Sequence, residues 1–144
     1  FFFFYRVNMN ISGSCTCGAV RYATSAEPVL LGNCHCQNCQ KMTGSAYSAT
    51  MFFPEQAVHI QGQVKYYTRQ GSGSKHSARG FCEVCGTPLF GKPSTMPGLI
   101  GIRAGTLDDP NIYKPTVDIF TASAVSWDHM DPEITKFAGF PPHE

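Results

Sequence analysis

Charged side chains are scarce in this sequence. Asp, Glu, Lys and Arg together make up 15% of its 144 residues, and the formal net charge is only +1. No run of Lys or Arg occurs, so the chain has no basic stripe of the kind that contacts the phosphates of DNA or RNA. We therefore expect no nucleic-acid partner.

Long apolar segments are also missing. No stretch reaches the roughly 18 consecutive apolar residues of a membrane-spanning helix, so we expect no membrane partner. The chain opens on four phenylalanines, and residues 1–8 follow neither the period of a strand nor that of a helix. We interpret residues 1–8 as a tag or an extension foreign to the fold, ahead of a single zinc-binding domain over residues 9–144. A hydrophobic anchor or a dimer contact is the alternative for this extension.

Helical periodicity is nearly absent, and short alternating segments separated by Gly and Pro take its place. The Gly-Ser-Gly-Ser segment at 71–74 is typical of a hairpin loop or a flexible connection. The alternation predicts an all-β domain with strands at residues 19–24, 45–53, 63–69, 99–104 and 117–120. We expect its core to contain the large aromatic side chains of Phe52, Phe53, Phe90, Phe120 and Trp127.

Cysteine is the exception to this plain composition, and an odd count of seven argues against a disulfide framework. Three of the seven, Cys34, Cys36 and Cys39, lie within six residues. Residues two apart in an extended segment point to the same side, and a C-x-x-C turn returns the third sulfur toward them. A tetrahedral zinc ion with three protein ligands keeps its fourth position for water or substrate, as catalytic zinc does. We therefore predict a catalytic zinc at these three cysteines.

A fourth protein ligand would close this site. The candidates are His35, His59 and His76, since histidine is a common zinc ligand. His35 alternates with two of the cysteines, so in an extended segment its side chain is expected to point away from the metal. The sequence leaves a closed site open as an alternative.

The other four cysteines form two short pairs, Cys15-Thr-Cys17 and Cys82-Glu-Val-Cys85, each followed by a glycine that tolerates a positive φ. Together they predict one closed four-sulfur site with a structural zinc, and therefore two zinc ions per chain. Buried or redox-active thiols are the alternative for these four residues. Because thiolates must stay reduced to hold zinc, we expect a reducing compartment, the cytoplasm.

The order of these motifs adds a family resemblance. The chain contains, in this order, Gly13-Ser-Cys-Thr-Cys-Gly18, Cys34-His-Cys-Gln-Asn-Cys-Gln-Lys41, Phe81-Cys-Glu-Val-Cys-Gly-Thr-Pro-Leu89 and Gly105-Thr-Leu-Asp-Asp109. Over residues 11–127 it resembles the family of glutathione-dependent formaldehyde-activating enzymes and centromere-protein-V-like proteins. The resemblance implies an all-β fold of stacked antiparallel sheets in a β-tent arrangement around a structural zinc. It also implies structural ligands at Cys15, Cys17, Cys82 and Cys85, and catalytic ligands at Cys34, Cys36 and Cys39.

The sequence departs from the family pattern near its C-terminus. Members usually carry Pro-x-x-His-Ile followed by an aromatic residue. Here Pro115-Thr-Val-Asp-Ile-Phe120 places Asp118 at the histidine position. The departure leaves all seven cysteines in place.

Three thiolates around zinc give the predicted open centre a formal charge of minus one, which leaves a bound thiolate electron-rich. A small thiol would fill the fourth position, lose its proton and add through sulfur to an aldehyde carbon. We therefore predict a zinc-dependent carbon–sulfur lyase that acts on adducts of a small thiol with an aldehyde. The family resemblance implies an activity similar to S-(hydroxymethyl)glutathione synthase, with a glutathione-like thiol and an aldehyde such as formaldehyde. A non-catalytic zinc β-module that binds a protein partner is the alternative. A redox or metal-sensing role for Cys36 and Cys39 is a third hypothesis.

Polar side chains next to the three cysteines could contact such a thiol. Lys41 could meet a carboxylate of the thiol. Hydrogen bonds could come from Gln37, Asn38, Gln40, Thr43 and Ser45. Backbone capping in a tight loop, or a solvated side chain, is at least as good an interpretation of each.

Overall fold

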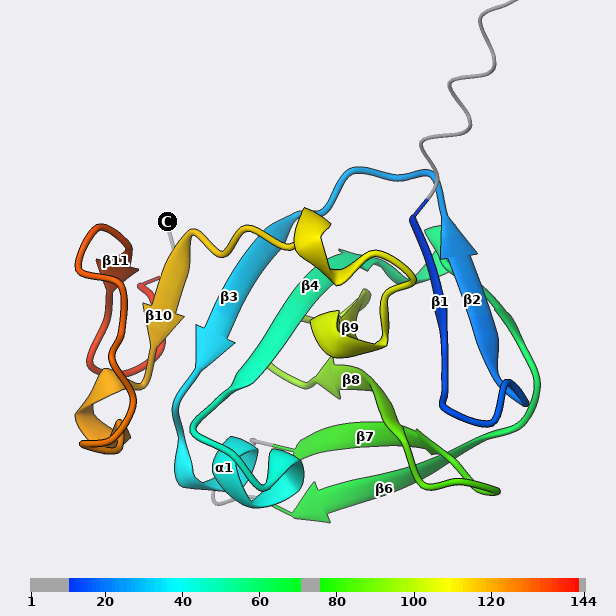
Figure 1. Cartoon of the computed structure of the whole chain (residues 1–144), viewed down its shortest axis with the longest axis horizontal. Helices are drawn as coiled ribbons and strands as arrows, with labels where there is room; N and C mark the ends of the chain where they lie inside the picture. The colour runs from blue at the N-terminus through cyan, green and yellow to red at the C-terminus, as the bar shows by residue number, and fades with distance from the viewer. Residues whose placement is uncertain (1–10, 71–75, 143–144) are drawn as a thin grey trace, which may run out of the picture.

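The computed structural model describes residues 11–70 and 76–142, which form two β-sheets and one short α-helix (Figure 1). The smaller sheet has the strand order β1-β2-β5 and consists of β1 (Ile11–Ser14), β2 (Arg21–Thr24) and β5 (His59–Gln61). The larger sheet has the order β11-β10-β3-β4-β9-β8-β7-β6 and consists of β3 (Leu30–Cys34), β4 (Ser48–Pro54), β6 (Val64–Gln70), β7 (His76–Cys82), β8 (Pro88–Pro93), β9 (Leu99–Arg103), β10 (Val117–Ile119) and β11 (Thr135–Lys136). The two sheets confirm the all-β class. The predicted extension at 1–8 and the predicted loop at 71–74 lie outside the described residues.

The five predicted strands correspond to β2, β4, β6, β9 and β10, each displaced by no more than three residues at either end. Strand β3 is absent from the prediction, because its sequence Leu-Leu-Gly-Asn-Cys lacks the alternation of apolar and polar residues. Its formation depends on neighbours on both sides, β4 and β10. This strand is important for the site, since Cys34 is its last residue.

The core lies between the two sheets. Tyr22 of β2 meets Phe90 of β8 edge-to-face, with ring centroids 5.5 Å apart. Phe53 and Phe90 are fully buried, as predicted, while Phe52 and Phe120 are partly buried. The smaller sheet is therefore packed onto the larger one through aromatic and aliphatic side chains that contribute the most buried area.

The prediction that Trp127 belongs to the core is wrong. Its side chain is 65% exposed. It lies in a turn in which the Asp128 backbone N–H donates to the carbonyl oxygen of Val125, beyond the last residue of β10. Because this turn is not part of either sheet, no second layer covers the indole.

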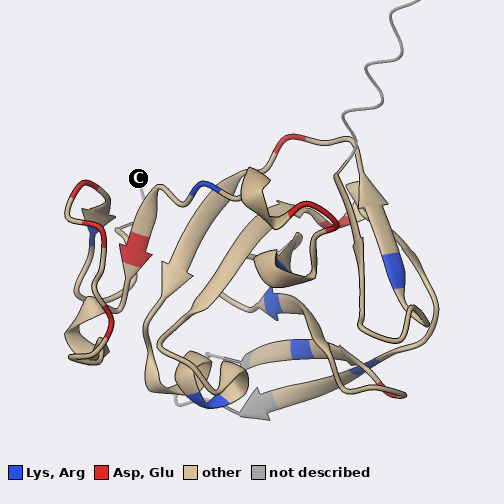
Figure 2. Ribbon diagram, in the orientation of Figure 1, with Lys and Arg blue, Asp and Glu red and all other residues tan. Residues whose placement is uncertain are grey.

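One end of the larger sheet departs from the antiparallel arrangement. Strand β10 runs parallel to β3 on one side and parallel to β11 on the other. The register places Asp118 opposite Asn33 and Ile119 opposite Cys34. Figure 2 shows the resulting acidic position in β10, at one edge of the molecule. The C-terminal part of the chain thus lies against the strand that leads into the three cysteines.

The helix α1 (Gln37–Thr43) is also absent from the prediction. It has seven residues, about two turns, which is too short for a helical period to stand out in the sequence. Cys36 is its N-cap residue, and Gly44 ends it in the left-handed region with φ 70°. Among the described residues, no helix is long and apolar enough to cross a membrane.

Candidate metal centres

Three thiols converge where β3 leads into α1. Cys34 ends β3, Cys36 caps α1, and Cys39 lies in the first turn of the helix. Their Sγ atoms all lie within 4.8 Å of one another. The helix begins directly after Cys36, so its first turn returns Cys39 toward the other two, and the Cys39 backbone N–H donates to Cys36 Sγ at 3.4 Å. We call this group the three-cysteine cluster.

The three thiols strongly affect one another's protonation. The Cys34 thiol, followed by the Cys39 thiol, lowers the pKa of Cys36 to about 2. Hydrogen bonds from Cys36 and then Cys39 raise the pKa of Cys34 above its ordinary range. One thiolate therefore forms readily, whereas the pKa shifts of the other two thiols disfavour further ionisation. Thiolates are soft ligands that suit zinc, so the donor set fits a zinc ion.

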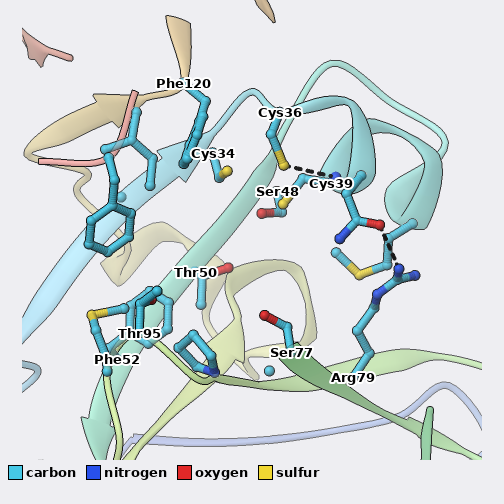
Figure 3. Close-up of a pocket in the computed structure, with 18 of the residues that line it drawn as sticks. Cys34, Cys36, Cys39, Ser48, Thr50, Phe52, Ser77, Arg79, Thr95 and Phe120 are labelled. Carbon is cyan, nitrogen blue, oxygen red and sulfur yellow. Dashed lines mark hydrogen bonds between the residues drawn. The ribbon is translucent and has the colours of Figure 1, made fainter. Parts of the chain in front are cut away.

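A cavity of about 680 Å³ opens in front of the three-cysteine cluster, as Figure 3 shows. The cluster occupies one end of it. The apolar part of its lining includes Phe52, Ile119, Phe120 and Phe140. The polar part includes Asn38, Ser77, Arg79 and Arg103. The sulfurs are thus accessible to a small molecule with both polar and apolar parts.

No fourth Cys, His, Asp or Glu joins this cluster in the part of the chain that the structure describes. His35 is fully buried, with its Nε2 atom 2.8 Å from Asp118 Oδ1, so it points away from the sulfurs as predicted. His59 belongs to β5 in the smaller sheet and is exposed. The side chain of His76 lies outside the described part.

A buried polar network supports the segment behind the cluster. Besides the contact with His35, Asp118 accepts hydrogen bonds from Asn33 Nδ2 and Lys136 Nζ, each at 3.1 Å. Burial opposes ionisation of this carboxyl, but the hydrogen bonds from His35, Lys136 and Asn33 hold its pKa below the ordinary value. The His35 backbone N–H also donates to the carbonyl oxygen of Ile119 at 3.0 Å. β10 therefore fixes the residue that separates the first two cysteines of the cluster.

The remaining four thiols form a second group, the four-cysteine cluster. Cys15 and Cys17 lie between β1 and β2, Cys82 ends β7, and Cys85 lies in the turn before β8. Their Sγ atoms also lie within 4.8 Å of one another. Cys15 and Cys82 are buried, whereas Cys17 and Cys85 are exposed. The cluster therefore connects the smaller sheet to the larger one.

The turns at the four-cysteine cluster have the geometry of metal-binding knuckles. Gly18 and Gly86 follow the two cysteine pairs with φ of 82° and 81°, a region in which residues with a side chain are strained. The backbone N–H groups of Val84 and Cys85 donate to Cys82 Sγ at 3.3 and 3.4 Å. The hydroxyl of Thr87 hydrogen-bonds Cys85 and lowers its pKa to about 5. Four sulfurs held by two such turns fit a closed structural zinc site.

Two of the polar residues singled out from the sequence line the cavity, Gln37 and Asn38. Gln40 is not one of the residues that line the cavity. Its side-chain amide donates to the backbone oxygens of His35 at 2.8 Å and Ser123 at 3.0 Å. Gln40 therefore connects the start of α1 to the segment after β10.

The other polar candidates cap the helix or face solvent. The Thr43 hydroxyl donates to the carbonyl oxygen of Cys39 at 2.9 Å and accepts from the backbone N–H of Ser45 at 3.1 Å. Lys41 is exposed and is not one of the residues that line the cavity. The capping interpretation is therefore the better one for Thr43 and Ser45.

Two arginines of the cavity are absent from the sequence-based prediction. Arg79 lies in β7 and Arg103 is the last residue of β9. The signal that could have singled out Arg103 is its position at the end of the apolar run Leu-Ile-Gly-Ile. That both arginines face the three-cysteine cluster depends on the strand order, which the sequence does not reveal.

The fold and the two clusters define a small all-β protein with two cysteine centres that could hold metal ions. The chain belongs to the family of glutathione-dependent formaldehyde-activating enzymes, whose model matches residues 10–123. A protein of Halomonas elongata that provisionally carries the same name is 26% identical over 141 residues, an alignment that covers 92% of this chain and 90% of the relative. A crystal structure of a Rhodobacter sphaeroides protein has a similar fold, with a TM-score of 0.57 and 18% identity, covering 72% of this chain and 96% of that one. The family resemblance seen in the sequence is thus confirmed.

Proposed function

We propose that this chain is a zinc-dependent carbon–sulfur lyase that joins a small thiol to an aldehyde and cleaves the product. Its family points to glutathione and formaldehyde as the substrates. The observation that carries the proposal is the three-cysteine cluster at the end of a cavity, with no fourth Cys, His, Asp or Glu joining it among the described residues. A closed four-ligand site would leave no position for a substrate sulfur.

In this proposal Cys34, Cys36 and Cys39 hold the catalytic zinc. A zinc ion bound by three thiolates would offer its remaining position to a substrate sulfur and favour loss of the thiol proton. The structural zinc would be held by Cys15, Cys17, Cys82 and Cys85. Its role is to keep the two sheets together, since its ligands come from both.

The proposed reaction is balanced without an oxidant or a reductant. In the synthetic direction the thiol sulfur adds to the aldehyde carbon, one carbon–sulfur bond forms, and the π bond of the carbonyl breaks. The proton of the thiol ends on the former carbonyl oxygen, which gives an S-hydroxyalkyl thioether. The reverse reaction breaks the same carbon–sulfur bond and returns thiol and aldehyde.

Two features of the cavity would assist this chemistry. The apolar part of the lining at Phe52, Ile119 and Phe120 would exclude water from the sulfur end, which limits hydration of the aldehyde. The Ser48 hydroxyl is buried and hydrogen-bonds the Cys39 thiol. Ser48 is therefore our candidate for the group that passes the proton to the aldehyde oxygen.

The test combines zinc content with exchange kinetics. The purified chain should contain two zinc ions and Cys36→Ser one, with the fold retained because the four-cysteine cluster is unchanged. Zinc-edge absorption should report one additional sulfur ligand when glutathione is added to the wild type. Exchange of ¹³C-formaldehyde with its glutathione adduct, followed by NMR, should be accelerated by the wild type and not by Cys36→Ser. Ser45→Ala, an exposed position near the cluster, is the matched control and should keep full activity.

Cys36→Ser with undiminished exchange activity would refute the catalytic role. An absorption spectrum that does not change with any small thiol, together with no acceleration by the wild type, would favour the alternative. In that case the chain would be a zinc β-module that binds a protein partner without catalysis.

A further inference from the structure

Two cationic side chains lie over the same point of the larger sheet, on the cavity side. Arg79 of β7 is directly opposite Gly91 of β8. The guanidinium group of Arg103 covers the same glycine, since a Cβ added to Gly91 would lie 2.6 Å from Arg103 Nη2. Figure 3 shows Arg79 reaching from β7 toward α1, where its Nη2 donates to Asn38 Oδ1 at 2.7 Å.

Neither arginine has a carboxylate partner within the described part of the chain. The described contacts of Arg79 are the Asn38 amide oxygen and the ring of Tyr67, and Arg103 Nη1 donates to the Thr50 hydroxyl at 2.9 Å. The Nε atoms of both arginines are buried and have no hydrogen-bond partner. None of the residues that line the cavity is Asp or Glu. Both groups therefore keep donor capacity for an anion.

Lys92 also borders the cavity and provides a contrast, but its side chain leaves the other face of β8, since Lys92 lies opposite Ala78 and Gly91 lies opposite Arg79. Its Nζ lies 2.8 Å from Glu55 Oε2 and is stacked over the ring of Tyr66. Its charge is thus already compensated by a carboxylate. Among the described residues that line the cavity, Arg79, Lys92 and Arg103 are cationic, and the two arginines lack such a partner.

Two partly buried positive charges that meet at the same glycine repel one another. Burial and the charge of Arg79 both lower the pKa of Arg103. An anion bound between the guanidinium groups would compensate both charges and satisfy their free donors.

We propose that Arg79 and Arg103 bind a carboxylate of the substrate and thereby select anionic thiols, with the sulfur at the cysteine end of the cavity. This inference rests on the proposed function. Guanidinium groups bind carboxylates with paired N–H donors, which fixes orientation as well as charge. Uncharged thiols such as 2-mercaptoethanol, and cationic ones such as cysteamine, lack this interaction. Arg79 and Arg103 therefore determine specificity, while the cysteines carry the chemistry.

The experiment compares ligands as well as variants. Dissociation constants are measured by calorimetry on the zinc-loaded full chain for glutathione, glutathione diethyl ester and S-methylglutathione. Since a hydrogen-bonded charge contributes more than a neutral group, wild type should bind glutathione about 10- to 100-fold more tightly than the ester. Arg79→Met should reduce that ratio to near one, and Arg79→Lys should restore part of it. The control Lys92→Met removes a cation that borders the cavity but leaves the other face of β8, and it should leave the ratio unchanged.

The outcomes separate this inference from the proposed function. Equal affinity of the wild type for glutathione and its ester overturns the carboxylate site, whatever happens at the sulfur. Tighter binding of S-methylglutathione than of glutathione diethyl ester supports the carboxylate site, because the carboxylates are free and the thiol is blocked. If glutathione then binds no more tightly than S-methylglutathione, that result counts against the proposed chemistry alone. A preference that survives in Arg79→Met but is lost in Lys92→Met overturns the assignment of residues. No binding of any of the three ligands overturns it as well.

Discussion

Asp118 is the residue whose replacement tests the architecture behind the site most directly. Its carboxylate is buried and has three partners, of which His35 is fully buried and Lys136 is partly exposed. Asp118→Ala would leave the buried His35 Nε2 and Asn33 Nδ2 without this acceptor. His35 Nδ1 makes no hydrogen bond among the described residues and has the Asp128 carboxylate 3.7 Å away, so the imidazole would lose the hydrogen bond that it makes there.

The loss of unfolding free energy expected for Asp118→Ala can be estimated from these contacts. Removing one partner of a buried, hydrogen-bonded charge costs about 3–5 kcal/mol, because the remaining polar groups stay desolvated. Lys136 can turn to solvent and adds little to this sum, so the control Lys136→Met should cost about 1 kcal/mol or less. The two variants, which remove opposite sides of one ion pair, should thus differ several-fold in the unfolding free energy that they lose.

The assay is urea unfolding of the zinc-loaded protein, followed by circular dichroism. Above pH 5 the difference in unfolding free energy between wild type and Asp118→Asn should be constant, because the carboxyl of Asp118 titrates near pH 4 in the unfolded chain and its folded pKa is lower still. As pH falls through the folded pKa, the wild type loses the stability contributed by the ionised carboxyl, and the difference should narrow. A loss of less than about 1 kcal/mol for Asp118→Ala, or a difference that widens on acidification, would refute the reasoning.

Three further predictions concern the metal centres and Arg103. Cys82→Ser should abolish the cooperative melt, because structural zinc contributes about 10 kcal/mol or more, comparable with the whole stability of a small domain; a melt close to wild type would contradict the structural assignment. Gly91→Ala should move the flexible guanidinium of Arg103 rather than the backbone, so glutathione affinity should fall while the melting temperature changes little, and unchanged affinity would count against a role for Arg103. Mild chelation in air should empty the three-cysteine cluster first and produce a disulfide between Cys36 and Cys39, detected as a two-hydrogen mass loss in that peptide. Earlier loss of zinc from the four-cysteine cluster would reverse this order.

Local spacing was enough to divide the cysteines correctly. In Cys34-His-Cys36 the alternation of an extended chain separates the imidazole from the sulfurs, and the structure places His35 on the far side with Asp118. The pairs around Cys17 and Cys82 carry their own turn glycines, so their geometry is also a local property. The five alternating segments became strands for the same reason, since a period of two is visible along a few residues.

Features that depend on neighbours far apart in the chain were not predictable. Trp127 has a large aromatic side chain of the kind expected in a core, yet its turn lies beyond the edge of the sheet and the indole is exposed. Helix α1 is too short to show a period and depends on the cap at Cys36. Strand β3 lacks alternation and forms because β4 and β10 pair with it.

The sequence by itself therefore determined which atoms could hold metal ions, because ligand sets of this kind are defined by spacings of two and three residues. Only the tertiary structure decided what surrounds them. The parallel pairing of β10 with β3 brings Asp118 to His35, and the order β9-β8-β7 brings Arg103 and Arg79 to the same glycine. The physical reason is that strand order and register arise from burying one face of every strand at once, a condition on the whole chain that no short segment contains.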